Sequence, residues 1–175
     1  MKALVIAVVG TKKAGKTTTT ENLIIELTKK GYKVAAIKHV SEPEFSIDTP
    51  GKDTWRFAQS GAKTVVSVAA NEVATIEKVP IDAVKIDWLL KKCRGSDIIL
   101  VEGFKKRLSR IDNIHKVVVV KSRKEAVDAL EIYRPILAFS GPYDATNVSS
   151  KVPYVDASKN PEKLAAIIEE NLLKK

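Results

Sequence analysis

An eight-residue segment near the amino end constrains this chain more than any other feature. Residues 10–17 read Gly-Thr-Lys-Lys-Ala-Gly-Lys-Thr, which matches the phosphate-binding pattern G-x-x-x-x-G-K-[ST] at every fixed position. The apolar run Ala3–Val9 leads into it, and an amphipathic pattern over Thr17–Lys30 follows it. A strand that enters a glycine-rich turn and continues as a helix is the framework such a loop needs, so the sequence predicts a P-loop.

Each fixed position of the motif has a chemical reason. Gly10 and Gly15 let the backbone curl until its amide groups converge on phosphate oxygens. Lys16 would reach the β- and γ-phosphates, and the Thr17 hydroxyl would bind Mg²⁺. We therefore expect a nucleoside triphosphate to contact Gly10, Thr11, Lys12, Lys13, Ala14, Gly15, Lys16, Thr17 and Thr18.

Apolar runs of strand length alternate with helical patterns along the whole chain, which is typical of βαβ units and a largely parallel sheet. The expected strands are Ala3–Val9, Lys33–Lys38, Lys63–Ala69, Glu72–Val79, Asp97–Val101, Lys116–Val120 and Ile136–Phe139. The expected helices are Thr17–Lys30, Lys52–Ser60, Asp82–Cys93, Arg123–Leu130 and a last one with Asn160 as its N-cap, while Gly103–His115 is expected to be a basic loop. The pattern predicts an α/β fold, a three-layer sandwich of P-loop NTPase type whose mostly parallel sheet carries an added antiparallel hairpin over residues 63–79.

Length and composition exclude several classes of protein. A chain of 175 residues with 45% apolar and 29% charged residues predicts one globular domain over residues 1–175. Its longest apolar run, Ala3–Val9, is far shorter than the roughly 18 residues of a membrane span, so no membrane partner is expected. Cys93 is the only cysteine, which excludes an internal disulfide and favours a reducing, cytoplasmic location.

The net charge of +9 favours a polyanionic partner. Nucleotides, phosphorylated cofactors and acidic protein surfaces all satisfy that requirement. Nucleic acid is not expected, because the lysines are spread along the chain and only 6% of the residues are aromatic, which leaves few platforms for base stacking.

Two carboxylates are candidates for the acidic group that accompanies a P-loop. Glu102 follows four apolar residues at the carboxyl edge of a predicted strand, where ligands of open α/β sheets collect. A solvated strand-end carboxylate is the alternative for Glu102, and Asp97 lies at the wrong end of that strand. Asp48 begins a D-x-x-G sequence, but a polar stretch precedes it, so we expect a magnesium or water-orienting carboxylate and not a literal GTPase switch.

Several segments together resemble the molybdopterin-guanine dinucleotide biosynthesis protein B (MobB) family. After the P-loop these are Lys38-His39, the block from Asp48 to Arg56 (DTPGKDTWR), Gly61-Ala62 and the VEGFK block that ends at Lys105. They span roughly residues 3–107 in the family's order and spacing. From Lys116 onward the chain shows only a compatible α/β pattern.

The resemblance implies a GTP-binding accessory protein of molybdenum or tungsten cofactor biosynthesis. Such a protein would assist the guanylyltransferase that joins GMP to molybdopterin, act as a homodimer whose sheet continues across the interface, and hydrolyse GTP slowly with Mg²⁺. Lys16, Asp48 and Glu102 would then be the catalytic residues, and Thr17, Glu102 and Asp48 the magnesium ligands. Residues 63–79 would extend the sheet in the dimer.

Five further residues of the matched segments are candidates for binding the cofactor or the partner protein. Lys38 and His39 follow a strand at the expected phosphate edge, although a packing histidine is as well supported there. Lys52 and Arg56 are four residues apart and would share one helical face, which could bind an acidic cofactor. The alternative is that this face is simply exposed to solvent. Lys105 opens the basic loop after Glu102.

A P-loop kinase that phosphorylates a small molecule with ATP is the alternative function. It would use Glu102 or Asp48 as the base and the basic loop as a lid. The chain has no N-K-x-D motif, so the motifs do not choose guanine over adenine. We expect the base contacts to come from the loop over residues 140–150.

Overall fold

The structure is a computed structural model that describes residues 3–42 and 44–173 and contains two compact units. The first unit lies within Met1–His39 and Lys92–Lys175, and the second is Val40–Lys91. Domain organisation over residues 1–175 stays a prediction, because two compact units can still unfold as one cooperative structure.

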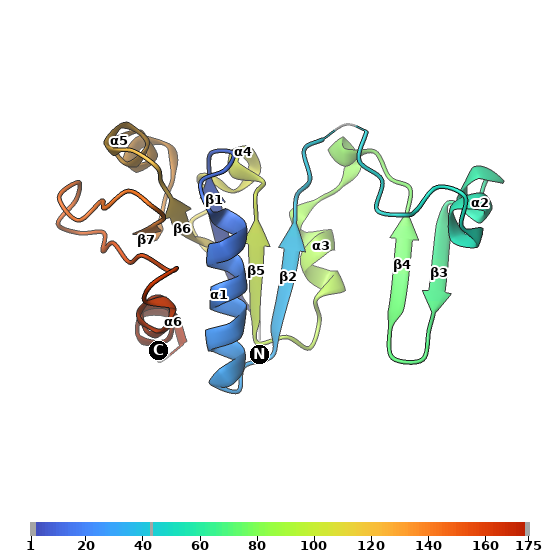
Figure 1. Cartoon of the computed structure of the whole chain (residues 1–175), viewed down its shortest axis with the longest axis horizontal. Helices are drawn as coiled ribbons and strands as arrows, with labels where there is room; N and C mark the ends of the chain where they lie inside the picture. Colours follow the sequence, from blue (N-terminus) through green and yellow to red (C-terminus); the bar gives the residue numbers. More distant parts are fainter. Residues whose placement is uncertain (1–2, 43, 174–175) are drawn as a thin grey trace. The chain divides into compact units, whose positions relative to one another are not determined.

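A five-stranded parallel sheet forms the centre of the first unit (Figure 1). Its strands, in spatial order, are β2 (Val34–Lys38), β5 (Ile98–Glu102), β1 (Leu4–Gly10), β6 (His115–Val119) and β7 (Ile136–Ser140). This order places the P-loop strand β1 in the middle, with the strand that ends at Glu102 directly beside it. The predicted parallel sheet is confirmed.

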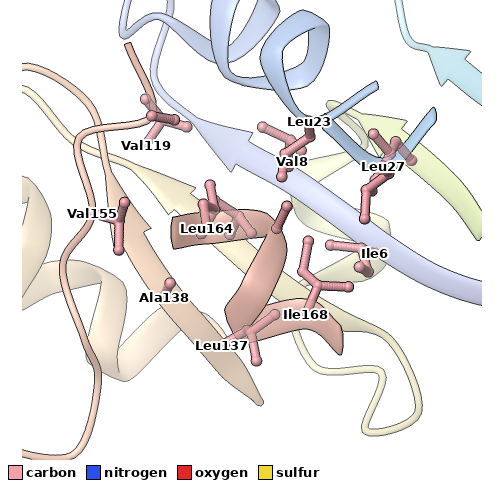
Figure 2. Close-up of a cluster of buried hydrophobic side chains, with 14 of the residues drawn as sticks. Ile6, Val8, Leu23, Leu27, Val119, Leu137, Ala138, Val155, Leu164 and Ile168 are labelled. Carbon is pink, nitrogen blue, oxygen red and sulfur yellow. The ribbon is translucent and has the colours of Figure 1, made fainter. Parts of the chain in front are cut away.

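The main hydrophobic core lies between one face of this sheet and two helices, α1 (Lys16–Lys29) and α6 (Pro161–Ile168). Figure 2 shows the side chains of Ile6 and Val8 from β1 among those of Leu23, Leu27, Leu164 and Ile168 from the helices. Because side chains alternate along a strand, every second residue of β1 enters this core. All six of these side chains are fully buried.

The alternate residues of β1, Val5, Ala7 and Val9, face the other side of the sheet and are also buried. Two helices add buried residues that lie outside the first core: α4 (Lys105–Leu108) contributes Leu108, and α5 (Arg123–Ile132) contributes Ala126 and Ala129. A sheet buried on both faces explains why its strands read as continuous apolar runs. The fold is the predicted three-layer α/β sandwich.

The second unit contains the predicted antiparallel hairpin. Its strands β3 (Thr64–Val68) and β4 (Val73–Glu77) form a two-stranded sheet and, within the described residues, pair only with each other. Helix α2 (Asp53–Gln59) precedes the hairpin, and the 3₁₀ turn η1 (Ile81–Ala83) and helix α3 (Ile86–Lys92) follow it.

The structure corrects two predicted segments. The helix expected from Asp82 begins only at Ile86, because the extended backbone of Val84 (φ −76°, ψ 112°) separates η1 from α3. The expected loop 103–115 contains α4, whose four residues are too few to show a helical period.

The π-helical turn η2 (Glu169–Leu173) follows α6 at the carboxyl end. Within the described ranges, every helix is too short or too polar to cross a lipid bilayer.

Candidate nucleotide-binding site

The register of the sheet brings the ends of its five strands to one edge. Glu102 at the end of β5 lies opposite Lys38 of β2 and Val8 of β1. On the other side of β1, Gly10 lies opposite Val119 of β6, which in turn lies opposite Ser140 of β7. The segments that follow these strands therefore surround the P-loop, as expected for a ligand site in an open α/β sheet.

The P-loop passes closely over the end of β6, and this explains the requirement for glycine at position 10. Gly10 has φ 152°, and a Cβ atom there would lie 2.3 Å from the carbonyl oxygen of Val119. At the other end of the loop, Gly15 adopts a left-handed conformation and starts α1 without a side-chain cap. The uncapped amino end of α1 supplies amide groups and a positive dipole end for phosphate.

Lys16 is the half-buried cation of the loop. Its Nζ atom donates a hydrogen bond of 2.6 Å to the carbonyl oxygen of Thr11 within the same loop. Burial lowers the pKa of Lys16, the Glu102 carboxylate opposes that effect, and the ammonium groups of Lys105, Lys38 and Lys121 lower it further. A cation that is short of counter-charge favours the arrival of a polyanion such as a triphosphate.

Thr17, Glu102 and Lys38 form one contact group beside Lys16. The Thr17 hydroxyl donates to Glu102 Oε1 at 3.1 Å, and Lys38 Nζ donates to Thr17 Oγ1 at 3.2 Å and lies 3.6 Å from Glu102 Oε1. Glu102 is buried, so it is not a solvated strand-end carboxylate. A hydroxyl and a carboxylate in contact are the oxygen ligands that Mg²⁺ prefers, and the donor set fits this ion.

Asp97 lies at the opposite end of β5, as expected. Its Oδ2 atom accepts a hydrogen bond of 2.8 Å from the amide of Lys33. This contact joins the residues that precede β2 and β5. Asp97 therefore stabilises the sheet at the edge away from the P-loop.

Two residues near the start of α5, Lys121 and Glu125, form hydrogen bonds with the P-loop that the sequence did not predict. The Thr11 hydroxyl donates to Glu125 Oε1 at 3.0 Å, and Lys121 Nζ donates to the carbonyl oxygen of Lys12 at 3.1 Å. Glu125 Oε2 also accepts from the amide of Lys121 at 2.8 Å. The only sequence signal was the pattern Ser122-Arg-Lys-Glu125, a capping box in which the Ser122 hydroxyl accepts from the Glu125 amide.

His39 packs against the segment that follows Glu102. Its ring centroid lies 4.6 Å from that of Phe104, and the Arg107 guanidinium lies 6.0 Å from the Phe104 centroid. The approach is close enough that a Cβ atom on Gly103 would lie 3.0 Å from His39 Cβ. His39 therefore packs on Phe104, and its role toward an anion stays a prediction. Lys105 is exposed at the start of α4.

Asp48, Lys52 and Arg56 belong to the second unit, where their contacts are local. Asp48 Oδ1 accepts from the Thr49 amide at 2.8 Å and from the Thr54 hydroxyl at 3.0 Å, which joins the loop to the first turn of α2. Lys52 is the uncapped N-cap of α2, and Arg56 lies 3.5 Å from the Asp53 carboxylate. Their roles toward the nucleotide or a partner stay predictions.

A pocket of about 260 Å³ opens beside the P-loop. Its lining residues come from the P-loop with the start of α1, from the segment after β7, and from the turn before α6: Lys13, Ala14, Gly15, Thr18, Thr19, Ser140, Gly141, Pro142, Asp156 and Ser158. The loop predicted to contact the base therefore contributes residues 140–142. The sequence analysis missed Asp156 and Ser158, because nothing in their local pattern distinguishes them from other turn residues.

Comparison with known proteins identifies similar chains. The family model for molybdopterin guanine dinucleotide synthesis protein B matches residues 5–139. A Haemophilus influenzae protein named molybdopterin-guanine dinucleotide biosynthesis adapter protein is 34% identical over 102 residues, which are 57% of this chain and 56% of that protein. A Methanocaldococcus jannaschii protein that carries the same name in provisional form is 31% identical over 148 residues, which are 82% of this chain and 58% of that protein. The chain thus matches little more than half the length of these relatives.

Solved structures show the same fold over nearly the whole chain. A crystal structure of molybdopterin-guanine biosynthesis protein B has a TM-score of 0.74 and 26% identity, covering 98% of this chain and 100% of that one. The crystal structure of Bacillus subtilis MobB has a TM-score of 0.69 at 21% identity, covering 93% and 95% of the two chains.

Proposed function

Because the chain belongs to the MobB family, we propose that it is a GTP-binding adapter that assists the attachment of GMP to molybdopterin. The observation that carries this proposal is the contact group of Thr17, Glu102 and Lys38, which lies beside Lys16 at the uncapped amino end of the P-loop helix. The family match is the reason for proposing GTP as the nucleotide and molybdopterin-guanine dinucleotide synthesis as the process.

Mg²⁺ would accompany the nucleotide at this site. The Thr17 hydroxyl and the Glu102 carboxylate, already in contact, would hold the ion, which neutralises charge on the β- and γ-phosphates. Lys16 would exchange the Thr11 carbonyl for phosphate oxygens when the nucleotide binds. Asp48 is proposed to orient the attacking water, and so small a set of catalytic groups is in keeping with slow GTP hydrolysis.

The basic residues at the phosphate edge support a role in receiving an anionic cofactor. Lys38 and Lys105 are exposed there, and both are close enough to Lys16 to lower its pKa. Together with His39 they would contact the phosphate of a molybdopterin-type cofactor. Lys52 and Arg56 of the second unit would meet the acidic surface of the guanylyltransferase. The lone free thiol, Cys93, is consistent with a cytoplasmic protein.

The hairpin β3–β4 supports a homodimer. Val66, Val68 and Val73 lie on one face of it and expose 56%, 74% and 66% of their surface. An isolated two-stranded hairpin is marginally stable in water, so a second copy of the chain would supply the missing cover.

Calorimetry of nucleotide binding tests the proposal directly. We expect Mg²⁺-dependent binding of GTP in preference to ATP by the wild type. Lys16→Ala should weaken GTP binding by about 1.5–3 kcal/mol, the worth of a charge-assisted hydrogen bond. Lys29→Ala, which removes an exposed charge from the far end of the same helix, should leave the affinity unchanged.

A preference for ATP would contradict the adapter proposal and favour the small-molecule kinase. Equal losses in Lys16→Ala and Lys29→Ala would show that only net charge matters, against a P-loop site. If the wild type binds no nucleotide, the proposal fails altogether.

A further inference from the structure

The pocket beside the P-loop is the part of the site that the phosphate motif does not explain. Gly15 of the P-loop and Thr18 of α1 line this pocket, so a nucleotide with its phosphates on the P-loop can place its nucleoside there. Its volume of about 260 Å³ is below the roughly 300–1,000 Å³ of pockets that enclose whole ligands, so it suits one end of a nucleotide.

The segment after β7, which lines the pocket, packs closely on the backbone at the end of β6. Gly141 follows β7 with φ 103°, and a Cβ atom there would lie 2.7 Å from the carbonyl oxygen of Val120. The segment that lines the pocket thus lies directly on the end of β6, and only glycine permits that approach. Pro142, next in the chain, presents an apolar ring to the same pocket.

Asp156 is the only acidic residue among those lining the pocket. Its side chain is 18% exposed. Oδ1 accepts hydrogen bonds from the Ser158 amide at 3.0 Å and the Ser158 hydroxyl at 2.6 Å, and Oδ2 lies 3.5 Å from Lys159 Nζ, which belongs to an exposed side chain.

These contacts keep the carboxylate ionised while leaving part of it available. The Ser158 hydroxyl lowers the pKa of Asp156 despite the opposing effect of burial. An ionised carboxylate has about four acceptor positions and no donor, so Oδ2 retains capacity for further hydrogen bonds. The pocket therefore offers a fixed acceptor that cannot donate.

The chemistry of the purine bases makes such an acceptor selective. Guanine presents two adjacent donors, N1–H and the 2-amino group, which one carboxylate accepts together. Adenine presents an acceptor at N1 and has no 2-amino group, so its lone pair would face the carboxylate. A site built to accept hydrogen bonds rejects the ligand that lacks the donors, because its own groups then stay unpaired.

We propose that Asp156 selects guanine by accepting hydrogen bonds from N1–H and the 2-amino group of a base in this pocket. The inference rests on the proposed function, since it assumes a nucleotide on the P-loop. It explains how a chain without an N-K-x-D motif would still discriminate between GTP and ATP.

Exchange of the carboxylate for an amide tests the inference. Asp156→Asn keeps an oxygen for the Ser158 contacts but adds a donor, which matches the 2-carbonyl of xanthine. By calorimetry with Mg²⁺ we expect Asp156→Asn to bind GTP about 10- to 100-fold more weakly, the effect of a lost charged hydrogen bond, and to bind XTP more tightly than the wild type does.

Asp128→Asn is the matched control. Asp128 on α5 makes a charged contact of 2.6 Å with Lys124, as an aspartate that is 47% exposed, and it does not line the pocket. Its substitution should leave the GTP, XTP and ATP affinities unchanged. In the wild type, ITP, which lacks the 2-amino group, should bind more weakly than GTP, and this measurement does not depend on whether a variant folds.

Several results would overturn the inference. Equal weakening of GTP and XTP in Asp156→Asn would show a structural role only, and equal wild-type affinity for ITP and GTP would exclude the 2-amino contact. Both leave the proposed function intact if the wild type still prefers GTP and Lys16→Ala still weakens GTP binding. Loss of all nucleotide binding by the wild type would instead remove the proposed function, and the inference with it.

Discussion

The two compact units of this chain differ most in what they bury. The first unit has apolar side chains with no exposed surface on β1, β5, β6, α1 and α6. In the described part of the second unit, Val65 is the only buried residue. Several of its large apolar side chains are more than half exposed: Phe45, Ile47, Phe57, Val66, Val68 and Val73.

This difference separates two ways of using apolar residues. The first unit buries them on both faces of a sheet, and such a close-packed core gives the P-loop and Glu102 a firm support. The second unit exposes them on a loop, a seven-residue helix and a hairpin, where they lose little of their contact with water. Under the proposed function, the first unit would supply the nucleotide site and the second would supply contact surface.

The largest expected effect tests the difference in burial directly. Ile6→Ala in β1 should destabilise the protein by about 2–5 kcal/mol, because it leaves a cavity among fully buried side chains. Ile47→Ala makes the same change at a residue of the second unit that is 82% exposed, and it should cost less than about 0.5 kcal/mol. Chemical denaturation of both variants measures the contrast, and similar losses would refute it.

A second prediction uses the one fully buried lysine of the described residues. Lys116 on β6 has no exposed surface, and its Nζ atom donates to the carbonyl oxygens of Ile111 at 2.7 Å and Arg134 at 2.6 Å. Burial lowers its pKa to about 8, and the Asp112 carboxylate opposes this only in part. A neutral amine still donates to both carbonyls, so deprotonation removes the desolvation cost and keeps the contacts.

The sign of the pH effect follows from proton counting. Between pH 8 and the ordinary lysine pKa of 10.5, the unfolded chain holds a proton on Lys116 that the folded chain has lost. The free energy of unfolding should therefore rise with pH over this window, by up to roughly 3 kcal/mol relative to Lys116→Met. Urea denaturation of both proteins from pH 7 to 10.5 measures it, and parallel pH profiles would contradict the assignment.

The smallest expected effect concerns the hairpin. Val68→Lys places a charge on the exposed apolar face and should weaken self-association at least about tenfold, or 1.4 kcal/mol, with little change in stability. Val127→Lys, which alters an exposed apolar residue of α5 in the first unit, is the control and should not change it. Analytical ultracentrifugation distinguishes the two, and a monomeric wild type would refute the dimer proposal.

Local sequence determined a large part of this protein. The P-loop was recognisable because its glycines, lysine and threonine are consecutive, and Glu102 because a buried strand ends at it. The strands were recognisable because both of their faces are apolar. The predicted start of α3 at Asp82 was wrong, because one extended residue, Val84, interrupts a pattern that is otherwise helical.

Tertiary structure alone decided which distant side chains meet. The pairing of β2 with β5 places Lys38 beside Glu102, and the segments after β6 and β7 place Glu125 beside Thr11 and Asp156 beside the P-loop pocket. The sequence places Lys116 at the start of an apolar strand, but it does not predict that two carbonyl oxygens accept hydrogen bonds from its Nζ atom. The sequence determines secondary structure through neighbours in the chain. A contact such as that of Thr11 with Glu125, 114 positions apart, depends on strand order and register, which no local pattern encodes.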